Sequence, residues 1–570
     1  MFMSGTDYRE SLRARKPSIY VNGRRVKSVA ADADLAAGVN AIGLTYDYAL
    51  KPELVPLMRA LQHTSGREVN RLIHIGRTSS DLLNKLEAVR LVCQETGCAQ
   101  RYLTGDAFNA LFQSTYRIDA DRGGDYHQRF LAYMHGAQER DLTCAVAMTD
   151  GKGDRSLRPH QQENPDSYVR IVERRRGGIV ISGVKAIVTG APYAHEILVM
   201  PGRNMTEADA AFAVCCAVPV DAKGLTIVAR PAGRPGESAA KFSARYGQST
   251  GVCLFERVFV PWDRVFLAGE WEHAGHLTLT YATHHRHTCI AARAGFGDLL
   301  IGAGALMTEA NGLDLDHAHG LRDQMVELIK IVEGFFACGV AASVYGTQDP
   351  AGNIMPDVVF SNIGKLLLAT QIYDMHRIAH HVSGGLIVSL PGPDEDHNPA
   401  TSAKLADVLR GRPDIPYDKR IEVARFIEDL TASSQGGWYS VISLHGGGSP
   451  EGMKKEIFRN YPLGNKVDLV ERLLERGVLT GPARKVTRNR QPGACCDSGC
   501  LPLPAAATQM VPLPKTSEAR RKIKAAAVKP ATGAKLAKGA KPAKSAKPAR
   551  PAKSAKRANL SKSVKKQASP

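Results

Sequence analysis

The stretch of sequence that decides the fold runs from 168 to 190 and reads YVRIVERRRGGIVISGVKAIVTG. Apolar and polar residues alternate over 168–173, which is typical of a half-buried strand. Residues 176–178 (RGG) form a turn signal. Residues 179–190 then predict a strand, a turn marked by Gly183, and a second strand. Three further segments have strand-like character, namely 197–200, 211–218 and 252–260. A cluster of strands is therefore expected in the middle of the chain.

Helical periodicity lies on both sides of these strands. Apolar residues at 54, 57, 58 and 61 have helical spacing, with Pro56 acceptable only in a first turn. Residues 79–91 are also periodic, and Ser79 and Ser80 before Asp81 suit a helix N-terminus. The helical pattern returns from about 281 to 477 and includes the apolar-faced stretch 325–343. Helices, then strands, then helices predict an α+β fold.

Composition sets the broad class of the protein. The 570 residues are 44% hydrophobic and 23% charged, which suits two or three domains with a large buried core. The first 15 residues are polar and charged, so no signal peptide is expected. The best apolar run, 299–307, is too short to span a membrane. Eleven cysteines without a secretion signal indicate a reducing cytoplasm rather than a disulfide framework.

The net charge of +19 belongs mainly to the C-terminal segment. Residues 511–570 hold 18 Lys or Arg and one acid, Glu518. KPAKSAK at 541–547 recurs as RPAKSAK at 550–556. With few large apolar residues, 486–570 is expected to be a disordered basic tail. Weak, nonspecific nucleic-acid binding by this polycation is one interpretation, and a solvated extension is the other.

Residues 147–155 read AMTDGKGDR and are the main candidate for cofactor binding. Small residues there let backbone amides approach a flat cofactor ring closely, and Lys152 and Arg155 could meet a pyrophosphate. As residues alone, the same segment is good turn chemistry. Gly384 and Gly385 follow an apolar helix, where glycine serves either close approach to a cofactor or a helix C-cap.

Taken with 187–190 (IVTG), this motif resembles the flavin-binding segments of a family that comprises 4-hydroxyphenylacetate 3-hydroxylases and 4-hydroxybutyryl-CoA dehydratases. The resemblance covers about residues 3–485 and implies FAD. It also implies an acyl-CoA dehydrogenase-like arrangement: a helical domain at 1–145, a β domain at 146–275 and a helical domain at 276–485, before the tail at 486–570. The flavin-contacting residues that it implies are Met148, Thr149, Asp150, Gly151, Lys152, Gly153, Asp154, Arg155, Ile187, Val188, Thr189, Gly384 and Gly385.

The same resemblance places half of an iron–sulfur site in this chain. The dehydratases of the family hold a 4Fe-4S cluster with three cysteines and a histidine, and Cys98 and His285 keep two of those places. Tyr102 and Ala292 stand at the other two, and an alanine side chain cannot bind iron. We therefore predict no metal. The alternative is a cluster rebuilt at shifted spacing from Cys93, Cys98, His285 and Cys289.

Other family positions have also changed. The dehydratase glutamates near the substrate correspond to Thr250 and Ile442, and its active-site tyrosine corresponds to Cys289. The residues with which the hydroxylases hold a phenol correspond to Thr104, Phe108 and Val146. We expect a small-molecule substrate, but the sequence does not identify it.

The expected function is that of a metal-free FAD-dependent oxidoreductase. Most specifically, we expect a monooxygenase that uses reduced FAD from a separate flavin reductase, with oxygen, on an aromatic or related substrate. His285 is the expected acid or base, with Tyr102 as its hydrogen-bonding partner, whereas His284 and His287 are expected on a solvated helix face. A core histidine satisfied by backbone is the other interpretation of His285.

Two alternatives to this function remain. One is a dehydratase or isomerase of a hydroxyacyl-CoA, with FAD and a rebuilt cluster. The other is an inactive scaffold whose basic tail holds nucleic acid. The expected assembly is a homodimer or homotetramer in the cytoplasm, without a membrane.

Overall fold

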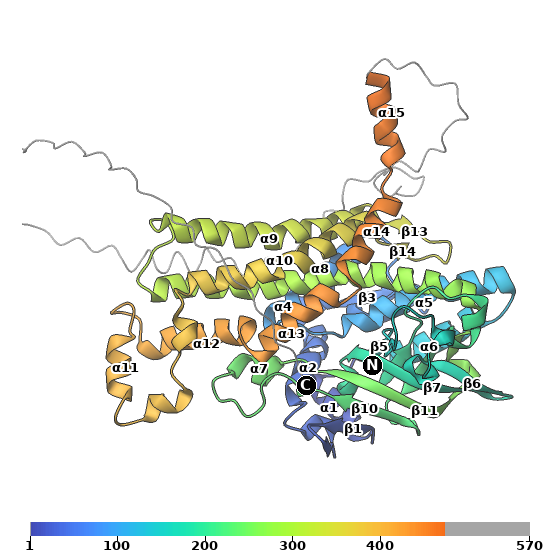
Figure 1. Cartoon of the computed structure of the whole chain (residues 1–570), viewed down its shortest axis with the longest axis horizontal. Helices are drawn as coiled ribbons and strands as arrows, with labels where there is room; N and C mark the ends of the chain where they lie inside the picture. Colours follow the sequence, from blue (N-terminus) through green and yellow to red (C-terminus); the bar gives the residue numbers. More distant parts are fainter. Residues whose placement is uncertain (1, 474–570) are drawn as a thin grey trace, which may run out of the picture. The chain divides into compact units, whose positions relative to one another are not determined.

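A computed structural model describes residues 2–473 (Figure 1). All described residues belong to one compact unit of the chain, residues 1–511. The second unit, residues 512–570, is not among the described residues, and neither is the predicted tail at 486–570. The described residues form a helix-rich α+β fold, which confirms the predicted fold class. Helices precede and follow a central group of strands, in the order that the hydrophobic pattern predicts.

The N-terminal part is mostly helical, but it also contains four short strands. The predicted helix through residue 61 is wrong. The helix around Pro56 ends at Met58, and 59–62 pairs with 67–70 as an antiparallel hairpin that uses the backbone groups a longer helix would need. The elements are α1 (Gly5–Arg13), β1 (Ser18–Val21), β2 (Arg24–Arg25), α2 (Ala36–Leu50), α3 (Val55–Met58), β3 (Arg59–Gln62), β4 (Arg67–Asn70), α4 (Ser79–Thr96), α5 (Tyr102–Arg122) and α6 (Tyr126–Glu139).

Helix α4 begins where the sequence predicts, and its first turn is closed by a capping box. The Thr78 hydroxyl accepts a hydrogen bond from the Asp81 amide at 3.1 Å, and the Asp81 carboxylate accepts one from the Thr78 amide at 3.0 Å. Two amides that would otherwise lack partners in the helix are thereby satisfied.

This cap gives a simple stability prediction. Replacing Thr78 by Ala removes the hydroxyl acceptor and should lower the free energy of unfolding by about 0.5–2 kcal/mol, as for other helix N-caps. Urea denaturation measures the change. The Thr78→Ser variant keeps the acceptor and should lie close to the wild type, so equal losses in both variants would contradict this role for the cap.

The central strands form two sheets. The six-stranded sheet has the order β2-β1-β10-β11-β7-β6, and the four-stranded sheet has the order β12-β9-β8-β5. Strand β1 pairs in parallel with β10, so residues from the predicted N-terminal domain extend the central sheet. The domain boundaries stay a prediction. The remaining strands are β5 (Cys144–Ala147), β6 (Arg170–Arg175), β7 (Gly178–Thr189), β8 (Glu196–Val199), β9 (Val214–Pro219), β10 (Leu225–Ala229), β11 (Thr250–Pro261) and β12 (Val265–Ala268).

The hairpin predicted at 168–190 is present as β6 and β7, but β7 has no turn at Gly183. The strand continues through this glycine, which has a φ of 128°. A Cβ atom at Gly183 would lie 2.2 Å from the Tyr168 carbonyl oxygen, so the glycine allows two backbones to approach closely. Glycine inside a strand pattern therefore marks a close contact here rather than a chain reversal.

The C-terminal helices α8, α9 and α10 lie side by side (Figure 1). Helix α8 also contacts α4, α5 and α12, so it is covered by helices from both halves of the chain. The helices are α7 (Lys241–Tyr246), α8 (Trp271–Ala310), α9 (His319–Val344), α10 (Val358–Val382), α11 (Ser402–Val408), α12 (Tyr417–Thr431), α13 (Ser434–His445), α14 (Pro450–Asn460) and α15 (Leu463–Leu473), and β13 (Thr347–Gln348) pairs with β14 (Ile354–Met355).

By length and composition alone, α8 could cross a membrane, which the sequence reading of 299–307 did not anticipate. However, 67% of its most apolar window is buried inside the protein. A mostly buried core helix passes the same test of length and composition, so this is weak evidence for a membrane span.

Candidate functional site

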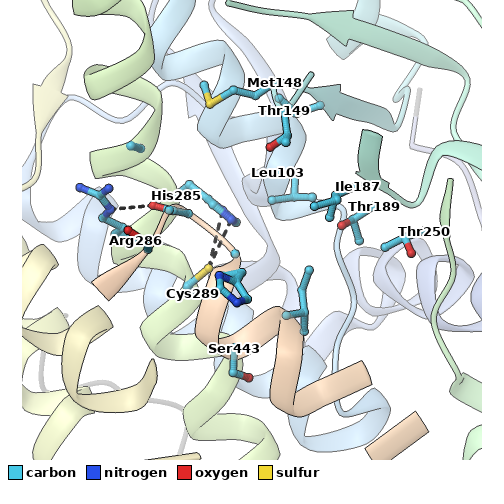
Figure 2. A pocket seen from close by; sticks show the side chains of 18 of the residues that line it. Leu103, Met148, Thr149, Ile187, Thr189, Thr250, His285, Arg286, Cys289 and Ser443 are labelled. Carbon is cyan, nitrogen blue, oxygen red and sulfur yellow. Dashed lines mark hydrogen bonds between the residues drawn. The ribbon is translucent and has the colours of Figure 1, made fainter. Parts of the chain in front are cut away.

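A cavity of about 1240 Å³ lies where the ends of the central strands meet the helices (Figure 2). Its lining comes from α5, β5 and the loop after it, β7, β11, α8, α10 and α13. Segments that are far apart in the sequence therefore form one site. Seven of the predicted flavin contacts line it: Met148, Thr149, Asp150, Lys152, Arg155, Ile187 and Thr189.

The other predicted flavin contacts lie outside the lining of this cavity. Val188 is fully buried in the core, and Asp154 accepts hydrogen bonds from Ser156 within its own loop. Gly384 and Gly385 follow α10 with φ angles of 68° and 77°, as in a helix C-cap. Gly151 and Gly153 belong to the loop but not to the lining. A role for these residues toward a flavin stays a prediction.

The strand side of the cavity presents an apolar surface. Ile187 has a φ of 59° and is 56% exposed, although it is a large apolar residue in a strand. A β-branched side chain rarely adopts a positive φ, and such strain is commonest at functional sites. Thr189 and Thr250 pair across β7 and β11 beside it, which places two hydroxyl groups next to this surface (Figure 2).

A buried ion pair anchors the loop at 147–155. The Lys185 ammonium donates to Asp150 Oδ1 at 2.7 Å and to the carbonyl oxygens of Met148 at 2.9 Å and Met200 at 2.7 Å. Burial raises the pKa of Asp150, and the Lys185 charge opposes that rise. The sequence reasoning missed Lys185, although a lysine within the apolar run 179–188 is a signal for a buried partner.

These features fit a flavin nucleotide. The cavity exceeds the usual volume of pockets for drug-sized ligands, roughly 300–1,000 Å³. Ile187 and Met148 supply apolar surface, the hydroxyls of Thr149 and Thr189 supply hydrogen-bonding groups, and Lys152 and Arg155 are cations suited to phosphate. The loop and the strand end would hold the flavin, where it would supply redox chemistry.

On the helix side, His285 is held by two side chains. Its Nδ1 lies 3.3 Å from Asp106 Oδ2, and its Nε2 lies 3.4 Å from Cys289 Sγ. Asp106 is fully buried, and it also accepts hydrogen bonds from Lys85 at 2.7 Å and Thr288 at 2.6 Å. His285 is thus bound by side chains rather than by backbone, and it faces the cavity.

The charges of this group follow from its contacts. Burial lowers the pKa of His285, but the nearby Cys289 and Asp106 outweigh burial and raise the pKa to about 9. Burial raises the pKa of Cys289, but His285, with Lys365 and Arg293, outweighs burial and lowers it. His285 is therefore protonated at neutral pH, which makes it a proton donor rather than a base.

Tyr102 lines the cavity, but it does not act on His285 as the sequence predicts. Its ring stacks on the His285 ring with centroids 6.4 Å apart, and Tyr281 stacks on the same ring at 5.5 Å. The Tyr102 hydroxyl instead bonds to Cys98. The pKa of Cys98 is lowered to about 6, first by a hydrogen bond from Cys93 and then by Arg293 and Tyr102, against the effect of burial.

The expectation that His284 and His287 lie on a solvated helix face is wrong. Both are buried because helices cover α8 on several sides. His284 bonds to Gln113 at 3.4 Å and His287 to Ser343 at 2.8 Å. Burial, followed by the Lys85 charge, lowers the pKa of both histidines to about 3, so they are neutral packing residues.

Three further cations line the cavity near Cys289, and sequence reasoning missed all of them. Arg286 donates to the Gly447 carbonyl oxygen at 2.8 Å, and Lys365 donates to the Ser443 carbonyl oxygen at 2.5 Å. Burial lowers the pKa of Lys365 to about 8. Arg293 is 5% exposed, and its Nη1 atom has no hydrogen-bond partner within residues 2–473. This end of the cavity therefore suits an anion.

The glycine loop at 446–448 forms the wall opposite α8. Gly447 and Gly448 have φ angles of 78° and 106°. A Cβ atom on Gly447 would lie 3.3 Å from the His285 ring, and one on Gly448 would lie 3.0 Å from Arg286 Nη2. Because these glycines lack side chains, the loop backbone can lie directly against α8 at His285 and Arg286.

The residues present do not fit an iron–sulfur cluster. Ala292 and Tyr102 line the cavity at two of the family's ligand places, and alanine offers no donor atom. Across residues 2–473, no group of three or more His, Cys, Asp or Glu side chains is placed to hold a metal ion. The set of Cys93, Cys98, His285 and Cys289 is therefore not assembled as a ligand set, and Cys93 and Cys98 are buried cysteines outside any disulfide.

Two family models and several known proteins match this chain. Residues 4–267 match the family "4-hydroxyphenylacetate 3-hydroxylase N terminal", and residues 274–475 match "4-hydroxyphenylacetate 3-hydroxylase C terminal". A relative from Clostridium aminobutyricum, 4-hydroxybutyryl-CoA dehydratase/vinylacetyl-CoA-Delta-isomerase, is 33% identical over 83% of this chain and 99% of its own length.

Two solved structures are also similar. An oxygen-tolerant archaeal 4-hydroxybutyryl-CoA dehydratase from N. maritimus has a TM-score of 0.81 at 34% identity, over 85% of this chain and 97% of the other. The oxygenase component of 4-hydroxyphenylacetate 3-monooxygenase, in complex with FAD, has a TM-score of 0.74 at 21% identity, over 83% of this chain and 98% of the other. The second likeness shows a shared fold.

Proposed function

Since this chain belongs to the 4-hydroxyphenylacetate 3-hydroxylase family, we propose that it is an FAD-dependent oxidoreductase. More narrowly, it is a metal-free monooxygenase that uses reduced FAD and oxygen on an aromatic or related substrate. FAD reduced by a separate flavin reductase would supply the activated oxygen. The protein works as a homodimer or homotetramer, and its site of action is the cytoplasm.

The observation that carries this proposal is the composition of one cavity. Loop 147–155 and the end of β7 supply groups suited to a flavin, while the helix side supplies a protonated histidine where the dehydratases of the family need a cluster ligand. Ala292 supplies no iron ligand, so the reaction that we propose does not involve a cluster. The lining of the cavity therefore supports flavin chemistry, and the residues at the family's cluster places speak against a cluster.

The chain's own residues have separate parts in this reaction. His285 can donate the proton on Nε2 to an oxygen atom that gains negative charge during the reaction. Asp106 fixes the orientation of the ring through Nδ1 and stabilises its charge. Arg293 has an unused donor with which to hold an anionic substrate group.

Anaerobic purification followed by flavin, iron and sulfide analysis tests the proposal. We expect the protein to bind FAD and to hold no stoichiometric iron. With a flavin reductase, NADH and a panel of phenols, oxygen uptake should then be coupled to hydroxylated product. About four irons and four sulfides per chain would overturn the metal-free assignment. Iron-free, FAD-loaded protein that forms no hydroxylated product would overturn the monooxygenase assignment.

A second candidate function is a dehydratase or isomerase of a hydroxyacyl-CoA. The identity of 33–34% to two dehydratases, against 21% to the oxygenase, favours it. It would require a cluster or another means of activating the substrate, because Thr250 and Ile442 supply no carboxylate to the cavity. Conversion of 4-hydroxybutyryl-CoA by anaerobic protein would decide in its favour. Failure to bind FAD at all would instead favour an inactive scaffold.

A further inference from the structure

Cys289 is the cysteine that lines the cavity. Of the eight cysteines in the described part of the chain, six are buried, and Cys289 and Cys338 are partly accessible. Cys338 lies on α9 and is not part of the cavity lining. Cys289 therefore differs from the other described cysteines in being both accessible and within the candidate active site.

The contacts of Cys289 are those of an activated nucleophile. Its sulfur lies 3.4 Å from His285 Nε2 and 3.7 Å from Nδ1, and Nδ1 in turn lies 3.3 Å from the Asp106 carboxylate. A thiol next to an imidazole that is itself oriented by a carboxylate has the arrangement of nucleophile, proton carrier and orienting group. The charges of Lys365 and Arg293 also favour the thiolate form of Cys289.

A second, independent feature points to the ligand. Arg293 lies four residues after Cys289 on α8, so the two side chains share a helix face about 6 Å apart along the axis. Arg293 is nearly buried and lines the cavity; its guanidinium is hydrogen-bonded to Cys98, whereas its Nη1 donor has no partner in the described residues. A buried guanidinium donor of this kind is satisfied by an anionic oxygen of a bound molecule.

We propose that Cys289 is a nucleophile that adds to a conjugated carbonyl compound whose anionic group is bound by Arg293. The inference goes beyond the proposed flavin chemistry, because the addition requires neither FAD nor oxygen. A compound of this class could enter as a substrate or arise as an oxidised product in the same cavity. The thiolate would retain it as a covalent adduct.

The step is balanced without an added oxidant or reductant. The sulfur lone pair forms a bond to the β-carbon, and the π electrons of the carbon–carbon double bond move toward the carbonyl oxygen to give an enolate. The proton on His285 Nε2 then passes to the α-carbon. Reversal of the same steps releases the compound, because the imidazole can take that proton back.

Conjugate addition suits this position better than acyl transfer. Cys289 lies in the middle of the continuous helix α8, where the backbone amides are used within the helix. A tetrahedral acyl intermediate needs a group of free donors around its oxygen, whereas an enolate needs only the proton that His285 supplies. A thiolate is also the softest nucleophile among the side chains that line the cavity.

Two fumarate esters test the proposal on the full-length protein as purified. Monomethyl fumarate carries a carboxylate and dimethyl fumarate does not, although both are conjugated acceptors. Peptide mass spectrometry locates the adducts, and N-acetylcysteine gives the intrinsic ratio of the two rates. We expect Cys289 to react before Cys338, with a monoester-to-diester rate ratio at least about tenfold above that of N-acetylcysteine. This readout does not depend on enzyme activity.

Variants separate the contributions of the three side chains. Cys338→Ser should leave the reaction unchanged, and Cys289→Ser should abolish the adduct. His285→Gln should slow both esters, whereas Arg293→Gln should slow only the monoester. The wild-type measurement decides the matter even if a variant does not fold: equal or faster reaction at Cys338, or a rate ratio equal to that of N-acetylcysteine, would overturn the proposal.

Discussion

Replacing Lys185 by Met is expected to lower the free energy of unfolding by about 3–5 kcal/mol and to weaken FAD binding at least tenfold. Lys185 is 2% exposed, and its ammonium is the charge partner of the nearly buried Asp150. Without it, a carboxylate is left buried and uncompensated, which is far more costly than the loss of an exposed pair. Two carbonyl oxygens, those of Met148 and Met200, lose a donor as well.

The effect on FAD binding follows from the position of the pair. Asp150 and Met148 belong to the loop that lines the cavity, so in the variant the loop loses its side-chain anchor on β7 and keeps the backbone hydrogen bond from Ala186 to Thr149. Urea denaturation measures stability, and titration of flavin fluorescence measures binding. The Lys185→Met/Asp150→Asn double variant removes the unpaired charge and should recover much of the stability while flavin binding stays weak.

A matched surface lysine provides the control. Lys330 pairs with Glu327 on α9, and both side chains are exposed. Lys330→Met should therefore change the free energy of unfolding by less than about 1 kcal/mol, with no change in flavin binding. If Lys185→Met bound FAD as tightly as the wild type, the assignment of loop 147–155 to the flavin would be wrong.

The second large effect is expected at Asp106. Asp106→Leu should lower the free energy of unfolding by about 3–5 kcal/mol, because Lys85, which is itself buried, loses its counter-charge. Thr288 and His285 lose their acceptor at the same time. Loss of the Asp106 charge also removes one of the causes that raise the pKa of His285.

A charge-free replacement shows whether the unpaired lysine causes this loss. The Asp106→Leu/Lys85→Met double variant should be clearly more stable than Asp106→Leu alone, since apolar residues can replace a buried ion pair with little loss. Asp374 on α10 forms an exposed pair with Arg377 and serves as the surface control. A double variant no more stable than Asp106→Leu would show that the unpaired charge is not the cause.

The sequence predicts the local features of this protein well. Short-range patterns of polar and apolar residues predict the hairpin at 168–190, the start of α4 at Ser79 and the α+β order of the elements. The family resemblance also brings loop 147–155 and the end of β7 to one cavity. These features depend on neighbours within a few residues or on motifs that can be read directly.

Long-range pairing could not be predicted in this way. Asp106 and His285 are 179 residues apart, and nothing in either local pattern indicates that they meet. Strand β1 pairs with β10 about two hundred residues later. The burial of His284 and His287 has the same origin, because helices from distant parts of the chain cover the middle of α8.

Helix α8 gives the site a property that follows from its continuity. His285, Cys289 and Arg293 are spaced four residues apart on one unbroken helix, so their distances are fixed by helix geometry and change little as the protein moves. Adaptation to differently shaped molecules then falls to the facing loop, where Gly447 and Gly448 provide backbone freedom. The groups on α8 are therefore held at fixed spacing, and the shape of the neighbouring wall is set by the glycine loop, which Arg286 holds through the Gly447 carbonyl oxygen.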